Sequence, residues 1–427
     1  MKKKRKQTPL ATETDILDGV RSGAIFGLVQ VDIRTPDWLK PQLAEFPPIF
    51  KHATVGREDI GPFMKAYCEK HNVLKKPSKM LISSYYAERI LLITPLLKFY
   101  LDLGLQVTKV HLLVEFPEHR PCFEKFATQV CDARRMGDKS TDSDILANTF
   151  KLIGNSAYGR ICMNKAKQTQ TKYADATFAT HLINTKRFKR CTKIDADLFE
   201  IELCKKAHKH DLPLQCGVWT YQIAKLRMLQ WHIQFLQYYL PKTNYQLTQM
   251  DTDSSYFGLS ESTLEECVYP EKKREFYENY HRWFPTLACS HHRKDFVETK
   301  LKNETWTPGD CCRAAHVYDK RTSGLFKLEY SGSGIVALCS KTYICFGEEG
   351  TKLSSKGIQK KRNLHKLCKE AYLKVLETQC AGFGVNKGFV TVKGKVYTYA
   401  QVRRGLSYLY CKRKIAEDGI STVPLDL

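Results

Sequence analysis

Apolar and polar residues alternate along residues 24–34, AIFGLVQVDIR, and this period of two predicts a strand. A proline-rich segment follows and predicts a loop. From Ser83 to Leu103 the apolar residues recur at helical spacing, and Gly104 is placed to end that helix. Residues 107–116, VTKVHLLVEF, predict a second strand.

Further along the chain, the pattern predicts a pair of helices and then a hairpin of strands. The helices cover about Phe123–Met136 and Asp142–Tyr158, with the turn-forming sequence GDKST between them, and so predict an αα-hairpin. Residues 160–205 alternate like strands, and Val218–Leu240 predicts a long helix. A strand hairpin is expected from about Tyr245 to Leu259.

Composition adds a strong charge imbalance to this picture. The 427 residues carry 68 Lys+Arg against 45 Asp+Glu, a formal net charge of +23, and 43% are hydrophobic. A chain of this length and apolar content can bury a large core, which excludes a disordered or fibrous protein. The surplus positive charge indicates an anionic partner, most commonly nucleic acid. The last 87 residues, with 17 Lys+Arg and 7 Asp+Glu, are the most basic sizeable block.

The sequence also bears on the compartment. No stretch approaches the length of apolar residues that spans a bilayer, so no membrane partner is expected. The basic N-terminus has no apolar region after it, and the 16 cysteines are scattered without a C-x-x-C pair. We therefore expect a protein that is not secreted, with reduced thiols. The run Lys2–Lys6 is either a nuclear localisation signal or a solvated basic arm, which leaves nuclear and cytoplasmic locations open.

The first motif with candidate chemistry is K-L-I-G-N-S-A-Y-G-R at Lys151–Arg160, which closes the second helix of the αα-hairpin. Lys151, Asn155 and Tyr158 recur at helical spacing and share one face. Lysine suits a phosphate and tyrosine suits stacking on a base, while Gly159 allows close approach of a base pair or another backbone. Alone, the motif is better explained by a solvated helix end that terminates at a glycine.

The second motif is Q-M-D-T-D-S-S-Y-F-G at Gln249–Gly258, which places Asp251 and Asp253 at the tip of the expected strand hairpin. Two close carboxylates repel each other unless a cation lies between them, and their hard oxygens suit Mg²⁺. Such metals neutralise charge in phosphoryl transfer. Taken alone, however, the motif is better explained by an ordinary surface turn rich in Asp and Ser.

The third motif is K-T-Y at Lys341–Tyr343, whose first and last side chains share one face of a strand. Taken together, K-x3-N-S-x-Y-G, then D-T-D-S 92 residues past Gly159, then K-x-Y 88 residues past Asp253, resemble motifs B, C and K-x-Y of family B DNA polymerases. The motifs look like those of the protein-primed, viral and Maverick/Polinton transposon branch. The resemblance covers nearly the whole chain from about Phe26.

The resemblance implies an α+β fold, with a polymerase palm containing an antiparallel sheet, helical-hairpin fingers and a small thumb. In chain order, it implies a basic N-terminal arm at 1–23, part of the palm at 24–120, fingers at 121–160, palm with the D-T-D-S hairpin at 161–345, and thumb at 346–427. The basic thumb would hold duplex DNA through phosphate contacts.

The resemblance also implies a role for each motif residue in DNA-directed DNA polymerisation with Mg²⁺ or Mn²⁺. Lys151 would bind the phosphates of the incoming dNTP, and Asn155, Tyr158 and Gly159 would line the nascent base pair. Asp253 would bind the catalytic metal, with Asp251 beside it supporting the metal site. Lys341 and Tyr343 would steady the primer strand of a DNA primer–template, and a terminal protein is a further candidate partner as primer.

One element of the family pattern is missing. Family B polymerases carry motif A, D-x-x-S-L-Y-P, ahead of motif B, and this sequence contains no S-L-Y-P. Asp32 is the nearest strand-borne aspartate, but its neighbours do not match, and the exonuclease domain of the family is missing as well. Since two metals need carboxylates from both sides of the palm, we expect a truncated form with weak or no polymerase activity alone.

Two other functions fit parts of the sequence. One is a non-catalytic DNA-binding remnant of a polymerase, which the missing motif A favours. The other is a glycosyltransferase that uses D-x-D to hold Mn²⁺ and a nucleotide sugar, which explains Asp251 and Asp253 but neither the Lys151–Gly159 motif nor the basic tail.

A group of cysteines and histidines lies apart from these motifs. Six such residues fall within 28 positions and are candidate Zn²⁺ ligands: Cys289, His291, His292, Cys311, Cys312 and His316. Their spacing matches no common zinc-finger pattern, so the sequence alone favours free thiols and surface histidines.

Overall fold

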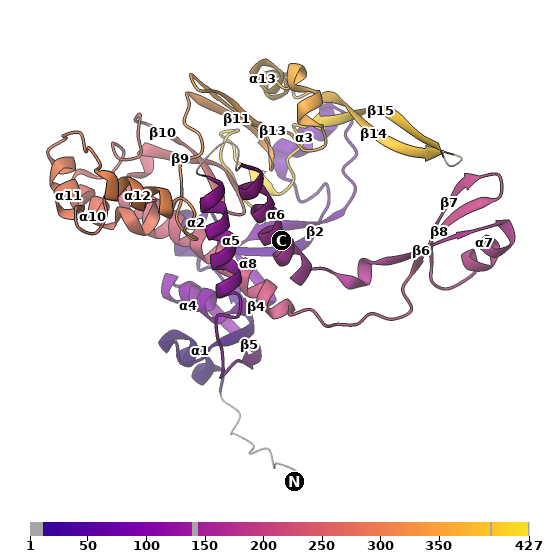
Figure 1. The fold of residues 1–427 in the computed structure, drawn as a ribbon, viewed down its shortest axis with the longest axis horizontal. Helices are drawn as coiled ribbons and strands as arrows, with labels where there is room; N and C mark the ends of the chain where they lie inside the picture. Colours follow the sequence, from indigo (N-terminus) through magenta and orange to yellow (C-terminus); the bar gives the residue numbers. More distant parts are fainter. Residues whose placement is uncertain (1–11, 139–143, 393–394, 426) are drawn as a thin grey trace, which may run out of the picture.

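The N-terminal half is organised around a three-stranded antiparallel sheet in the order β4-β1-β5, formed by Gly27–Arg34, Tyr86–Ile93 and Gln106–Glu115. The computed structural model describes residues 12–427 except 139–143, 393–394 and 426. Helix α1 (Glu13–Ser22) begins with a capping box between Thr12 and Asp15. It packs beside helix α4 (Thr94–Leu103) against the sheet (Figure 1). The basic run Lys2–Lys6 lies outside the described residues.

The strands predicted at 24–34 and 107–116 are confirmed as β1 and β5. The helix predicted from Ser83 to Leu103 is wrong in its first half, because Tyr86–Ile93 forms strand β4 and only Thr94–Leu103 is helical. Gly104 ends that helix as predicted, with the positive φ of 101° that favours glycine. The Gln222 side chain holds β4 from outside the sheet, since it accepts from the Ile93 amide and donates to the Leu91 carbonyl.

The predicted αα-hairpin is present as α5 (Glu124–Gly137) and α6 (Asp144–Ile161), which run side by side in the centre of Figure 1. Gly137 lies against Ala147, and Gly154 lies against Val130, so the two helices are antiparallel. Both glycines allow close packing. A Cβ at Gly137 would lie 2.6 Å from the Ala147 nitrogen.

Residues 160–205 combine strands with a helix that the sequence pattern did not predict. Strands β6 (Thr169–Ala174), β7 (Phe188–Asp195) and β8 (Leu198–Cys204) form a small antiparallel sheet in the order β6-β8-β7. Helix α7 (Ala176–Ile183) packs on this sheet through Ala179 and Leu182, which are buried with Ile201 and Leu203. The long helix predicted at 218–240 is present as α8 (Leu214–Gln230), a π-helical turn at Trp231–Leu236 and α9 (Gln237–Tyr239).

The second half of the chain alternates hairpins with helices. The hairpin predicted at Tyr245–Leu259 is confirmed as β9 (Tyr245–Asp251) and β10 (Ser254–Leu259). Helices α10 (Lys273–Trp283), α11 (Arg293–Leu301) and α12 (Asp310–Asp319) follow and share an aromatic core with the π-helical turn. The three-stranded sheet β11 (Gly334–Cys339), β12 (Thr342–Gly347) and β13 (Gly350–Ser354) comes next.

The C-terminal segment ends by returning to the N-terminal half. Helix α13 (Lys369–Thr378) precedes a long hairpin of β14 (Gly382–Val392) and β15 (Lys395–Leu406), which projects from the molecule in Figure 1. The short strands β16 (Arg413–Ile415) and β17 (Thr422–Pro424) then pack on α3 (Gly61–Lys70) and β3 (Ser78–Ser84). Strand β2 (Ile49–Val55) pairs with β3, and the short helix α2 spans Lys40–Leu43.

As a result, one hydrophobic core contains residues from the C-terminal segment and residues from the N-terminal half. Cys411 and Leu425 are buried with Val55, Ile60 and Met64. The partly buried Arg413 guanidinium donates to the Ser83 hydroxyl and to the Thr422 carbonyl. The architecture is therefore mixed α+β with small antiparallel sheets, as expected from the sequence at that level. Within the described residues, no helix combines the length and apolar character needed to cross a bilayer.

Candidate functional site

The Asp-Thr-Asp turn connects β9 to β10 through a tight two-residue loop. Asp251 is paired with Ser254 across the hairpin, and the Asp253 amide donates to the Asp251 carbonyl at 2.6 Å. Thr252 has a φ of +54°, which is unfavourable for a β-branched residue. Strained backbone of this kind concentrates at functional sites. The turn presents Asp253 to solvent and leaves Asp251 partly covered.

The K-T-Y segment approaches this turn from a second tight loop, between β11 and β12. Lys341 occupies that loop with a φ of +63°. Its Nζ lies 2.6 Å from Oδ2 and 3.0 Å from Oδ1 of Asp251. The two motifs, 90 residues apart in the sequence, are thereby joined by an ion pair.

A pair of tyrosines makes the second contact between the hairpins. The hydroxyls of Tyr256 on β10 and Tyr343 on β12 lie 2.6 Å apart, and their ring centroids are 4.7 Å apart. Tyr343 is only 8% exposed. Burial, followed by the hydrogen bond with Tyr256, raises the pKa of Tyr343. A phenol held neutral in this way serves as a fixed hydrogen-bonding anchor between the two hairpins.

Gln249 is a residue of this site that the sequence reasoning did not single out. It lies two positions before Asp251 on β9, so the two side chains share one face of the strand. Both polar atoms of its amide are buried without a hydrogen-bond partner among the described residues. Buried amides are normally paired, so this group is a candidate ligand contact. The sequence did carry one indication of this, because Gln249 and Asp251 are two positions apart in Q-M-D, as residues on one face of a strand are.

The other predicted residues lie on a separate element. Lys151, Asn155, Tyr158 and Gly159 are all exposed on α6. Tyr158 is 38% exposed, and partial burial together with a hydrogen bond to Cys162 raises its pKa to about 12. Among the described residues, no hydrogen bond or ion pair joins this face to the Asp-Thr-Asp turn. The structure thus brings Asp251, Asp253, Lys341 and Tyr343 together, but not the α6 motif with them.

Asp32, the nearest strand-borne aspartate ahead of α6, has structural partners. Its carboxylate accepts from the Arg89 backbone amide at 2.6 Å and lies 2.8 Å from His111 Nε2. The hydrogen bond from the Arg89 amide lowers the pKa of Asp32. This carboxylate therefore connects the strands of the β4-β1-β5 sheet.

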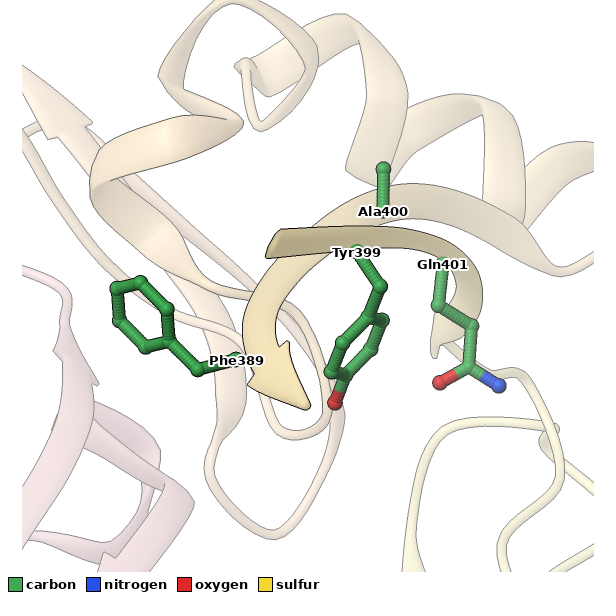
Figure 2. A pocket seen from close by; sticks show the side chains of 4 residues that line it. All are labelled: Phe389, Tyr399, Ala400 and Gln401. Atoms are coloured by element: carbon green, nitrogen blue, oxygen red, sulfur yellow. The ribbon is translucent and has the colours of Figure 1, made fainter. Parts of the chain in front are cut away.

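The β14–β15 hairpin carries an exposed surface of aromatic and basic residues. Phe389 and Tyr399, which Figure 2 shows flanking a shallow hollow with Ala400 and Gln401, are 79% and 44% exposed. Exposed Lys387, Arg403 and Arg404 lie on the same hairpin. Cations interleaved with exposed rings are typical of surfaces that contact nucleic acid.

The donor atoms of the Asp-Thr-Asp turn suit Mg²⁺ in type. Magnesium is commonly bound by one or two protein carboxylates together with substrate phosphates. Asp251 and Asp253 supply two carboxylates, although Lys341 already neutralises Asp251. Within the described residues, no third acidic or histidine ligand gathers with them.

A cysteine–histidine cluster forms a second candidate metal centre. The donor atoms of Cys289, His292, Cys311 and Cys312 all lie within 4.8 Å of one another. The hydrogen bond with His292 lowers the pKa of Cys289 to about 6. Of the two other histidines in this part of the sequence, His291 lies 4.0 Å from the Cys289 sulfur, and His316 contacts the Thr286 carbonyl instead.

No protein-family model, no curated protein and no solved structure matches this chain.

Proposed function

We propose that this chain is a DNA-directed DNA polymerase of the family B type that transfers nucleotides weakly by itself. The observation that carries the proposal is the docking of the D-T-D-S hairpin on the K-T-Y hairpin through the Asp251–Lys341 and Tyr256–Tyr343 contacts. Two motifs that resemble those of one enzyme family, far apart in the sequence, meet in one place. Such contacts are not expected between an unrelated surface turn and an unrelated tripeptide.

The roles of the hairpin residues follow from their positions. Asp253 is exposed at the turn and, with Asp251, would hold Mg²⁺. When bound, that ion neutralises charge on the phosphates and on the attacking oxygen. Lys341 is 60% exposed at its side chain and can exchange between Asp251 and a primer phosphate. Tyr343 fixes the distance between the two loops.

The exposed face of α6 supports the nucleotide part of the proposal. Lys151 presents a cation for the dNTP phosphates, and Tyr158 presents a ring for the base. Apart from its chain neighbours and the backbone of its own helix, no atom lies within 4 Å of the position that a Cβ of Gly159 would take, so a base pair can approach the helix there. The αα-hairpin that carries this face would have to close toward the β9–β10 turn for the two groups of residues to act together.

Charge supports DNA as the macromolecular partner. The net charge of +23 and the aromatic and basic surface of β14–β15 favour a polyanion with bases available for stacking. Neutralisation of several phosphates makes affinity fall steeply with salt.

A second candidate function is DNA binding without catalysis. The observation that favours it is the pairing of both Asp251 oxygens with Lys341, together with the lack of a third carboxylate near the turn among the described residues. The missing motif A points the same way.

Two assays on one preparation separate these functions. Binding to a labelled primer–template duplex should weaken by orders of magnitude between about 50 and about 200 mM salt for both candidates. Primer extension with dNTPs and Mg²⁺, at protein excess, should add template-directed nucleotides slowly for the polymerase and add none for the DNA-binding protein. Binding that does not respond to salt would exclude both.

A further inference from the structure

The cysteine–histidine cluster joins two segments of the chain. Their nearest members, His292 and Cys311, are 19 positions apart in the sequence. Cys289 and His292 form a tight turn before α11, where the His292 amide donates to the Cys289 carbonyl. Cys311 and Cys312 are the second and third residues of α12. Cys312 is 1% exposed, whereas Cys311 is exposed, so the cluster lies at the edge of the aromatic core.

The distances between the donor atoms describe a tetrahedron. The Cys289 sulfur lies 3.6 Å from that of Cys311 and 3.7 Å from that of Cys312. The Nδ1 atom of His292 lies 3.2, 3.5 and 3.6 Å from the sulfurs of Cys289, Cys311 and Cys312. With Zn–S of about 2.3 Å and Zn–N of about 2.0–2.1 Å, tetrahedral geometry separates two sulfurs by about 3.8 Å and a sulfur from a nitrogen by about 3.6 Å.

We propose that Cys289, His292, Cys311 and Cys312 bind one Zn²⁺ ion in a closed structural site. Three thiolates and one imidazole form a ligand set that favours zinc over hard cations such as Mg²⁺. Four protein ligands complete the tetrahedral coordination, which leaves no position for a reacting water. The site is therefore structural rather than catalytic, and it is independent of the proposed polymerase function.

The local backbone favours the charged thiolates that a metal requires. Cys311 and Cys312 lie in the first turn of α12, where the amides and the helix dipole stabilise negative charge. The Cys289 amide also donates to the Cys312 sulfur at 3.5 Å. Hydrogen bonds of this kind orient metal-bound sulfurs.

A disulfide is the main competing explanation for close cysteines. Cys289 is almost equidistant from the sulfurs of Cys311 and Cys312, and both distances far exceed the S–S bond length of about 2.05 Å. A disulfide would use two of the three thiols and would leave His292 without a role. The metal accounts for all four residues.

The site fixes the start of a helix whose other end contacts the αα-hairpin. Beyond the last turn of α12, Arg321 donates to Asp138 at 2.6 Å. Within that turn, the Tyr318 ring packs 3.7 Å beneath the Arg135 guanidinium of α5. Binding of zinc at Cys311 and Cys312 would therefore hold the start of α12 in place, while its other end packs against α5.

The direct test is the metal content of the full chain, purified without chelators and dialysed against metal-free buffer. We expect one zinc per chain, and we expect Cys289→Ser and Cys311→Ser to reduce it to near zero. His291→Gln and Cys368→Ser are matched controls that should retain the metal, because neither residue belongs to the cluster. Stoichiometric zinc that survives Cys311→Ser would overturn the proposal, as would zinc lost equally from the controls.

Cobalt substitution keeps the test decisive if a variant fails to fold. Metal-depleted wild-type chain titrated with Co²⁺ should reach saturation at one equivalent, with the visible absorption of tetrahedral cobalt and sulfur-to-cobalt charge transfer in the near ultraviolet. Absence of those bands in the reduced chain would contradict the site. So would a Cys289–Cys311 or Cys289–Cys312 disulfide found by peptide mapping of freshly purified protein without reductant.

Discussion

Lys341 Nζ lies 2.6 Å and 3.0 Å from the two carboxylate oxygens of Asp251, although 90 residues separate them in the sequence. Each residue belongs to a tight hairpin loop in which one residue has a positive φ, namely Thr252 in one loop and Lys341 itself in the other. The ion pair is largely solvated, so it contributes little to folding. The ion pair instead positions the Lys341 ammonium group beside the acidic turn.

Replacement of Lys341 by methionine tests this positional role. We expect the free energy of unfolding to change by less than about 1 kcal/mol, because exposed ion pairs are weak. Affinity for primer–template DNA should fall for all sequences, and the slope of log affinity against log salt should decrease by about one, as expected for one lost phosphate contact. Equilibrium binding across a salt series measures both.

Lys302→Met is the control for that experiment, because Lys302 is also exposed but follows α11 and belongs to neither hairpin. An unchanged salt slope in Lys341→Met, or an equal change in both variants, would exclude a specific phosphate contact by Lys341.

Alanine at Gly159 separates a nucleotide-binding role from a structural role. A Cβ at Gly159 meets nothing within 4 Å, and alanine favours helix over glycine by up to about 1 kcal/mol. Thermal stability should therefore be unchanged or slightly higher, while dNTP or DNA affinity should fall severalfold because the methyl group blocks close approach. Unchanged affinity would remove Gly159 from the proposed site.

Gly137→Ala provides the opposite comparison on the same helical hairpin. Its Cβ would lie 2.6 Å from the backbone nitrogen of Ala147, so α5 and α6 would have to separate. We expect a loss of about 1–3 kcal/mol in the free energy of unfolding, as is usual for overpacking. Denaturant unfolding of both glycine variants beside the wild type measures the contrast.

The buried imidazole of His232 predicts a pH dependence of stability. Burial, helped by the nearby positive charge of Lys242, lowers the pKa of His232 to about 4. Its unfolded value is about 6.5, so between these values the unfolded chain binds the additional proton. The contribution of His232 to the free energy of unfolding is therefore fully present above about pH 6.5. It declines as the pH falls toward 4, by up to about 3 kcal/mol.

Denaturant unfolding at a series of pH values, for the wild type and His232→Phe, measures this contribution. The difference between the two proteins should change across pH 4–6.5 and stay constant above it. The His181→Gln variant, which removes an exposed histidine, is the control. It keeps His232 and the cysteine–histidine cluster, so the pH profile of its stability should parallel that of the wild type. A pH profile for His232→Phe that parallels the wild type would contradict the prediction.

The sequence predicted those elements whose signals are local. Strand β1, the αα-hairpin and the β9–β10 hairpin follow from periodicity and turn residues, and Gly104 ends α4 for the expected steric reason. Strand β4 was predicted as helix because ILLI at 90–93 is a short apolar run that both structures accommodate. Its pairing with β1 decides the outcome, and pairing is a long-range property.

Local sequence patterns do not predict the contacts that define the two candidate sites. K-T-Y is too short to predict a partner, and only the fold brings Lys341 to Asp251. Gln249 became a candidate because its amide is buried, which no spacing reveals. The four residues of the cysteine–histidine cluster lack the regular spacing of a zinc finger, and the two helices that begin at the cluster supply the geometry instead.

The most direct test of the central proposal is template-directed extension of a labelled primer by the wild-type chain and by Asp253→Asn. At protein excess with Mg²⁺, we expect slow addition of the nucleotide that the template specifies, and its loss in Asp253→Asn at unchanged DNA affinity. Glu261→Gln, which removes an exposed negative charge beyond the end of β10, should extend the primer like the wild type. Equal extension by the wild type and Asp253→Asn, or no extension by any of the three proteins, would contradict the assignment of polymerase chemistry to this hairpin.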